Sequence, residues 1–181
     1  NDSIVHFEKK YDGFGGYWVK LSCDDLEDTS IVTIRYMRHQ EKMSTFVYDT
    51  DKVASWITPS YYLDSENNTN REKAHQIYNH QLTIKENASN ICRFVRRHIM
   101  YRPNFKRKPA SLKASQTLLQ QEGMCLNFTR LFIALCRASG IAARSITGVV
   151  LHPDRYFFHH EWAEYMDEDN VWHPMDLTYT R

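Results

Sequence analysis

Three residues in the second half of the chain have the side-chain types of a cysteine-dependent catalytic group: Cys125, His160 and Asp176. A cysteine nucleophile needs a base that takes the thiol proton, and the base in turn needs a group that orients it. Histidine accepts a proton near neutral pH, and a carboxylate can hold the imidazole in the required tautomer. The set therefore predicts nucleophilic catalysis by a thiolate, with the nucleophile first in chain order.

Cys125 lies at the expected start of an apolar helix, shortly after Gly123. The unpaired N–H groups and the positive dipole end of a helix stabilise an anion, so this position favours the thiolate. The same N–H groups point to the place where the oxyanion of a tetrahedral intermediate would form. Gly123 is expected to let the backbone turn tightly and to leave room for an approaching substrate.

His160 and Asp176 are expected on two neighbouring antiparallel strands, at residues 157–165 and 171–178. Side chains alternate along a strand, so both residues can point from one face of the sheet and lie within hydrogen-bond distance. The start of the Cys125 helix would then have to pack across that face. This arrangement would bring the three side chains together.

The residues around His160 are expected to have structural roles. His159 must face away from the side of the strand that His160 occupies, which makes it a surface or structural residue. Trp162 shares the face of His160 and is expected to support the strand by packing. Arg144 and Glu164 are expected to pair with each other and to brace the sheet.

The first third of the chain has the pattern of a small antiparallel β module over residues 1–58. Runs of β-branched and aromatic residues are separated by glycines and acidic turn residues, which is typical of short strands. The four expected strands are at residues 4–7, 17–21, 31–36 and 45–48.

The rest of the chain, residues 59–181, predicts an α+β core. Capping boxes at Thr69–Glu72 and Thr83–Glu86 predict the starts of two helices. An apolar helical pattern then runs from Cys125 to a left-handed cap at Gly140. A short helix at residues 114–119 and a strand at residues 143–150 complete the core.

The composition excludes several classes of protein. The net charge of +1 gives no overall field that would attract nucleic acid or anionic lipid. No apolar run reaches the ~20 residues that span a bilayer. The basic loop at residues 102–113 is better explained as a solvated loop than as a nucleic-acid site, because no series of aromatic residues accompanies its charges. We therefore expect no nucleic-acid partner and no membrane span.

The cysteines and histidines do not predict a metal site. The spacing of the four cysteines fits no zinc pattern, and Cys125, His159 and His160 offer no clear fourth ligand. Cys92 and Cys136 lie among apolar residues in helical patterns, which predicts buried structural thiols. No metal and no organic cofactor are expected.

Three linked segments resemble the transglutaminase-like superfamily. Residues 123–144 are similar to the family's nucleophile helix, which reads G-x-C, then an apolar helix, then R-x-x-G-I-x-A-R. His160-Glu161-Trp162-Ala163-Glu164 is similar to its H-x-W-x-E strand. Trp172-His173-Pro174-Met175-Asp176-Leu177-Thr178 is similar to its W-x-x-x-D-x-T strand. The resemblance is close over residues 114–178 and extends back to about residue 61.

The resemblance implies a papain-like α+β core in which the Cys125 helix packs on an antiparallel sheet. It also implies a triad of Cys125, His160 and Asp176 that transfers an acyl group from an amide or an ester through a thioester. In family members a second oxyanion donor comes from an upstream side chain.

The identity of that second donor stays open in this sequence. Gln116, Tyr101 and Asn104 are the candidates.

The expected function is hydrolysis of peptide or side-chain amide bonds by a protease or amidase, since nothing in the sequence marks a lysine-accepting channel. Two alternatives stay open: a protein-glutamine transamidase, and a non-catalytic binding domain that keeps the fold. The expected partner is a peptide or protein substrate, and the β module at residues 1–58 is a candidate for binding a further surface partner. The compartment is unknown, although a start that looks processed favours an extracytoplasmic location.

Overall fold

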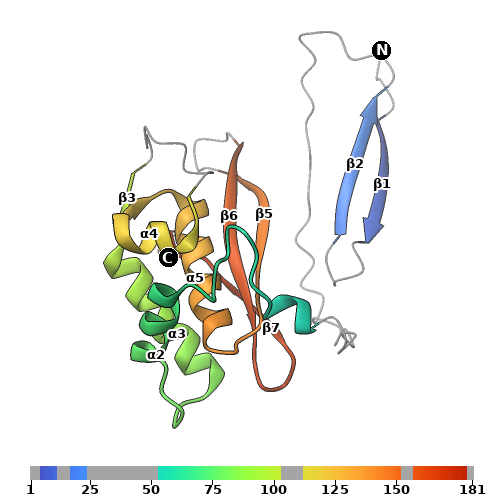
Figure 1. Cartoon of the computed structure of the whole chain (residues 1–181). Helices are drawn as coiled ribbons and strands as arrows, with labels where there is room; N and C mark the ends of the chain where they lie inside the picture. The colour runs from blue at the N-terminus through green and yellow to red at the C-terminus, as the bar shows by residue number, and fades with distance from the viewer. Residues whose placement is uncertain (1–4, 12–16, 24–52, 103–111, 152–156, 179–181) are drawn as a thin grey trace. The chain divides into compact units, whose positions relative to one another are not determined.

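The structure is a computed structural model that describes residues 5–11, 17–23, 53–102, 112–151 and 157–178 (Figure 1). The chain divides into two compact units, Asn1–Tyr48 and Asp49–Arg181. In the first unit, strands β1 (Val5–Tyr11) and β2 (Tyr17–Cys23) pair in the antiparallel direction along their whole length.

The two strands of the first unit overlap the predicted strands at residues 4–7 and 17–21. The strands predicted at residues 31–36 and 45–48 lie outside the described residues. The module boundary expected after residue 58 and the surface partner of this module stay predictions.

The second unit combines helices with a three-stranded sheet. Its helical elements are η1 (Ala54–Trp56), α2 (Asn68–Ile77), α3 (Ile84–His98), α4 (Ala114–Gln120) and α5 (Cys125–Ala138). Its strands are β3 (Met100–Tyr101), β4 (Glu122–Gly123), β5 (Ala143–Leu151), β6 (Phe157–Met166) and β7 (Trp172–Met175).

Helix α5 is the central element of this unit. Strands β5, β6 and β7 form an antiparallel sheet in that order, and β3 and β4 form a short parallel pair. Helix α5 contacts β5 and β6 and also α2, α3 and α4, so it lies between the sheet and the other helices (Figure 1). The predicted α+β core, with a helix packed on an antiparallel sheet, is confirmed.

The starts of α2 and α3 show which predicted capping box forms. At α3, the Thr83 hydroxyl accepts from the N–H of Glu86 (3.2 Å), and the Glu86 carboxylate accepts from the N–H of Thr83 (2.9 Å), as predicted. At α2 the prediction is wrong, because the cap is Asn67, whose side chain accepts from the N–H of Thr69 (3.0 Å). An asparagine caps a helix at least as well as a threonine, so the helix already begins at Asn68.

Asn87 ties the connection between α2 and α3 to the first turns of α3. Its side chain is fully buried. The amide oxygen accepts from the N–H of Asn79 at 2.8 Å. The amide nitrogen donates to the carbonyl oxygens of Asn79, Leu82 and Thr83 at 2.9, 3.2 and 3.1 Å. Both ends of the amide are therefore used inside the protein, which fixes the loop that precedes α3.

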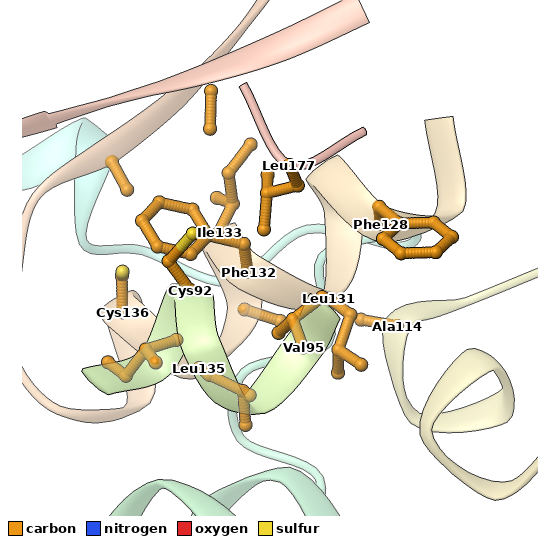
Figure 2. Packing of buried hydrophobic residues seen from close by; sticks show 14 of the residues in the cluster. Cys92, Val95, Ala114, Phe128, Leu131, Phe132, Ile133, Leu135, Cys136 and Leu177 are labelled. Atoms are coloured by element: carbon orange, nitrogen blue, oxygen red, sulfur yellow. The ribbon is translucent and has the colours of Figure 1, made fainter. Parts of the chain in front are cut away.

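The main core surrounds α5 (Figure 2). Consecutive residues Leu131, Phe132 and Ile133 are all fully buried, so the middle of this helix is covered on all sides. The residues that cover it from α3 and the sheet include Ile91, Cys92, Val95, Ala143, Ala163 and Tyr165.

Cys92 and Cys136 lie in this core as free thiols, as predicted. Burial raises the pKa of the Cys92 thiol and raises that of Cys136 well above its ordinary value. Both side chains are therefore protonated near neutral pH and act as small apolar residues.

The two faces of the β5–β6–β7 sheet have different neighbours. Ala163 and Tyr165 of β6 belong to the core around α5, so the helix covers the face from which they point. His160 and Trp162 alternate with them and point from the opposite face. The body of α5 therefore packs on the face opposite to His160, and the expectation that the start of this helix packs across the His160 face stays a prediction. The wide apolar surface of α5 is buried against the face that carries the small Ala163.

The face opposite α5 carries the predicted ion pair between Arg144 and Glu164. The guanidinium of Arg144 lies 2.8 Å from the Glu164 carboxylate and donates to it from Nε at 2.9 Å. The same guanidinium lies 4.1 Å from the centre of the Trp172 ring. The pair thus connects all three strands, since these residues belong to β5, β6 and β7.

Glu161 lies on β6 directly after His160, at the contact with α5. Its backbone carbonyl accepts from the hydroxyl of Thr129 in α5 at 3.2 Å, and its carboxylate accepts from the Ser145 hydroxyl at 2.5 Å. Burial raises the pKa of the Glu161 carboxyl, and the Ser145 hydrogen bond and the charges of Arg130 and His160 oppose this shift only in part.

We expect Asn87→Ala to lower the free energy of unfolding by about 2–4 kcal/mol, because it removes a buried amide that serves several backbone groups and leaves them unpaired. Urea unfolding followed by circular dichroism measures the change. Asn90→Ala is the matched control on the same helix: its side chain is partly exposed and accepts one hydrogen bond, from Arg93. Equal losses in the two variants would contradict the role assigned to Asn87.

As the pH rises from about 4 to about 7, the free energy of unfolding of Glu161→Gln should increase relative to that of the unchanged protein. The pKa of this carboxyl is higher in the folded state than its ordinary value of 4.5, so its contribution to stability is full below that value and is lost as the pH rises through the folded-state pKa. Glutamine cannot ionise and does not lose that contribution. Urea unfolding at both pH values tests this, with the exposed-pair variant Glu122→Gln as control. A difference that shrinks with pH would show that the Arg130 charge outweighs burial.

Candidate active site

His160 and Asp176 meet in the structure. His160 Nε2 lies 2.7 Å from Asp176 Oδ2, and the imidazole is nearly enclosed, with 5% of the residue exposed. Asp176 lies just past the end of β7, so the prediction of one strand through residue 178 is wrong at this end. The reason is local: Asp176 Oδ1 accepts from the N–H of Thr178 (3.0 Å) and from its hydroxyl (3.2 Å), which turns the chain after Met175.

The hydrogen bond with Asp176 selects the tautomer of the ring. A carboxylate only accepts, so Nε2 of His160 carries the proton, and the neutral ring has its lone pair on Nδ1. Because Thr178 holds the second oxygen of the carboxylate, the position of Asp176 is fixed from two sides. The proton acceptor of this pair is therefore His160 Nδ1.

Cys125 is the first residue of α5 and is partly exposed, in contrast to the buried thiols of Cys92 and Cys136. Among the described residues, none accepts a hydrogen bond from the backbone N–H of Cys125 or of Leu126. These two donors and the positive end of the helix dipole lie next to the thiol, which is the arrangement that stabilises an oxyanion.

The turn that precedes Cys125 is held by Asn127. This side chain is fully buried, and its oxygen accepts from the N–H of Met124 at 3.0 Å. A Cβ atom on Gly123 would lie 2.5 Å from the Cβ of Asn127. The space at Gly123 is thus taken up by Asn127, and the expectation that the glycine leaves room for substrate is not what the structure shows.

The start of α5 is anchored next to the His160 strand. Thr129 lies one helical turn after Cys125, on the same side of the helix. It donates to the carbonyl of Glu161, the direct neighbour of His160. In the described part of the chain no hydrogen bond joins the Cys125 thiol to the His160 ring. Catalytic hydrogen bonds of this kind often tighten only when substrate is bound, so the geometry is compatible with a Cys125–His160 pair.

Tyr101 and Gln116 are the two candidates for the second oxyanion donor that the structure describes, and Tyr101 borders the start of α5. It lies opposite Gly123 in the β3–β4 pair, and its ring centre is 6.1 Å from that of Phe128. Gln116 is exposed, and its side-chain oxygen accepts from the N–H of Lys113 at the start of α4. Asn104 lies outside the described residues.

Several residues that shape the site have no clear signal in the sequence. Asn127 and Thr129 lie inside an apolar helix pattern, where polar residues usually face solvent, yet both are buried and bond to neighbouring backbone. A polar residue near the start of a helix can be predicted to bond to the turn before it only once the helix boundary is known. His159 is exposed, as expected for a residue that alternates with His160.

Among the described residues, no group of three or more histidine, cysteine or carboxylate side chains is placed to hold a metal ion. No helix there has the length and apolar character needed to cross a bilayer.

Residues 71–177, more than half of the chain, match the sequence model of the transglutaminase-like superfamily. Among solved structures, a "putative cysteine protease" from Cytophaga hutchinsonii is similar, with a TM-score of 0.61 and 24% identity over 72% of this chain and 43% of that protein. The periplasmic domain of TgpA from Pseudomonas aeruginosa is also similar, with a TM-score of 0.53 and 18% identity over 72% of this chain and 48% of that domain. No curated protein matches the chain in sequence.

The present chain spans less than half the length of either solved structure, and at these identities the likeness is one of fold. The family match includes the helix that begins at Cys125, the strand with His160 and the segment with Asp176. The chain belongs to the transglutaminase-like superfamily.

Proposed function

We propose that this chain is a thiol hydrolase that cleaves peptide or side-chain amide bonds through a thioester on Cys125, with His160 as base and Asp176 as the residue that orients it. The observation that carries the proposal is the 2.7 Å hydrogen bond between His160 Nε2 and Asp176 Oδ2. It directs the basic Nδ1 atom away from the carboxylate, which is what a histidine that serves a cysteine requires.

Acylation begins when His160 Nδ1 takes the proton of the Cys125 thiol. The thiolate attacks the carbonyl carbon of the amide, a C–S bond forms, and the carbonyl oxygen becomes an oxyanion. The N–H groups of Cys125 and Leu126 are the donors available to hold that oxyanion. His160 then gives its proton to the departing nitrogen, the C–N bond breaks, and an amine leaves while the acyl group stays on sulfur.

Deacylation runs through the same groups. Water takes the place of the amine, His160 Nδ1 removes one of its protons, and the oxygen attacks the thioester carbon. The second tetrahedral intermediate collapses with cleavage of the C–S bond, and a carboxylic acid leaves. Asp176 stays ionised throughout and stabilises the imidazolium that forms in both half-reactions.

Hydrolysis is preferred over transamidation because water needs no second binding site for an acyl acceptor. The protease name of the Cytophaga hutchinsonii protein is in line with this choice, although the likeness to it is one of fold. If a primary amine reached the same thioester before water did, the reaction would be transamidation. The two reactions are therefore separated by their products.

The alkylation rate of Cys125 by iodoacetamide should stay high below about pH 7 and should fall about 100-fold when His160 is replaced, because the thiolate then loses its imidazolium partner. His160→Gln is used beside His160→Ala, since glutamine fills more of this enclosed position. Asp176→Asn should lower the rate by a smaller factor by releasing the ring. Peptide mass spectrometry across pH gives the rate for each cysteine separately.

Cys92 and Cys136 serve as internal controls, because both are buried with a raised pKa and should react slowly at every pH until the protein unfolds. If Cys125 reacts no faster than these two thiols and does not respond to the loss of His160, the triad is not assembled. The chain would then be a non-catalytic binding domain that keeps the fold.

The second test identifies the acyl acceptor. A mixture of glutamine-containing peptides is incubated with the protein in the presence and absence of a fluorescent primary amine. We expect new carboxylic acid products in both cases, and a loss of at least about 1,000-fold in Cys125→Ala. Amine incorporation in place of hydrolysis would make the protein a transamidase and would overturn the hydrolase assignment while keeping the triad.

A further inference from the structure

The strand next to His160 carries a glycine that the backbone itself does not require. Gly148 of β5 lies directly opposite His160 of β6 in the antiparallel register. It does not have the positive φ that favours glycine, whereas Gly140 does, at +79°. Glycine within a strand costs roughly 0.5–1 kcal/mol relative to alanine, so its presence here needs another explanation.

That explanation is the indole of Trp162. A Cβ atom at Gly148 would lie 2.7 Å from Cη2 of Trp162 and 2.9 Å from Cζ3, closer than side-chain atoms approach each other. In the register Trp162 lies opposite Ile146, so its ring reaches diagonally across β5 to Gly148. The outer ring of the indole therefore rests on the bare backbone of Gly148.

The same indole lies beside the His160 imidazole. The ring centres are 6.2 Å apart, and the two planes are inclined by only 27°. The hydrogen bond with Asp176 fixes one atom of the imidazole, Nε2, and the indole of Trp162 lies nearly parallel to the plane of the ring. The χ2 torsion of histidine is broad, so the ring can still swing about that contact unless a neighbour limits it.

We propose that Trp162, seated on Gly148, is a positioning residue that sets the plane of the His160 ring and so directs Nδ1 to Cys125. The proposal rests on the proposed thiol hydrolase function, because it assigns the indole a part in that reaction. Trp162 acts through His160 and itself touches no reacting atom. The simpler view, in which Trp162 only stabilises the sheet by packing, predicts changes in stability without changes in thiol reactivity.

The test uses steric compensation between the two positions. Gly148→Ala adds one carbon below the indole and should displace it, which lowers the alkylation rate of Cys125 at about pH 6 by about tenfold or more and shifts its pH profile. Trp162→Phe removes the outer ring that the new carbon would meet, so the double variant should react faster than Gly148→Ala alone. Trp162→Ala should lose as much reactivity as Gly148→Ala.

The matched control is Trp172→Leu. Trp172 is a buried indole from the same sheet, and it lies opposite Met166 at the far end of β6 from His160. Its loss should lower stability without changing the alkylation profile. Urea unfolding of every variant separates a general loss of folded protein from a change at the site. The carboxyl groups of Asp176 and Glu161, which interact with His160, are left unchanged in every variant.

The outcomes separate this proposal from the function on which it rests. If the unchanged protein shows fast, His160-dependent alkylation while Gly148→Ala and Trp162→Ala stay within about twofold of it, the positioning role is overturned and the triad remains. If the double variant is no faster than Gly148→Ala, displacement of the Trp162 indole by the added carbon is not the cause of the lost alkylation rate. If the unchanged protein shows no His160-dependent alkylation, the proposed function itself fails.

Discussion

The burial of α5 on all sides is the constraint from which the rest of the second unit follows. A helix with apolar residues around its whole circumference is stable in water only if other elements cover every side of it. Helices α2, α3 and α4 cover one part, and the sheet covers the other. The first turn is the place where this cover ends, which is why Cys125 is partly exposed while Leu131 and Phe132 are not. The Cys125 thiol is partly exposed because this residue begins a helix that is otherwise enclosed.

The far end of α5 is held by a buried cation. Arg137 donates to the carbonyl of Ala143 from Nε at 3.0 Å and from Nη2 at 2.8 Å, and to the carbonyl of Thr58 at 2.5 Å. Burial lowers the pKa of this guanidinium below its usual value. Its protons satisfy the carbonyl group of Ala143 at the start of β5, so the end of the helix is tied to the strand that follows it. Together with the Thr129–Glu161 contact, this fixes α5 against the sheet at two points far apart along the helix.

Much of the fold could be predicted from local patterns, and the errors arise where tertiary contacts decide. The capping box at Thr83 depends on residues close in sequence, and it formed as predicted. The cap of α2 is Asn67 and not the predicted Thr69, because both residues can cap a helix and the sequence pattern does not rank them. Strand alternation predicted that His160 and Asp176 can meet, and they form a hydrogen bond although Asp176 lies just past the end of β7. It could not show which face α5 covers, because that depends on side-chain size at Ala163 and on charge at Arg144 and Glu164.

Two of the buried asparagines, Asn87 and Asn127, have a consequence for producing this protein. Asn87-Ala88-Ser89 and Asn127-Phe128-Thr129 both have the N-x-S/T form that is the acceptor for N-linked glycans. Their side chains are fully enclosed and bonded to backbone groups, in the loop before α3 and at the start of α5. A sugar attached to either amide before folding could not be accommodated in the native packing. Expression through a eukaryotic secretory pathway would therefore divert chains from folding, whereas expression in a host without this glycosylation would not. Replacing Ser89 by alanine would remove the acceptor sequence at Asn87 without altering Asn87 itself.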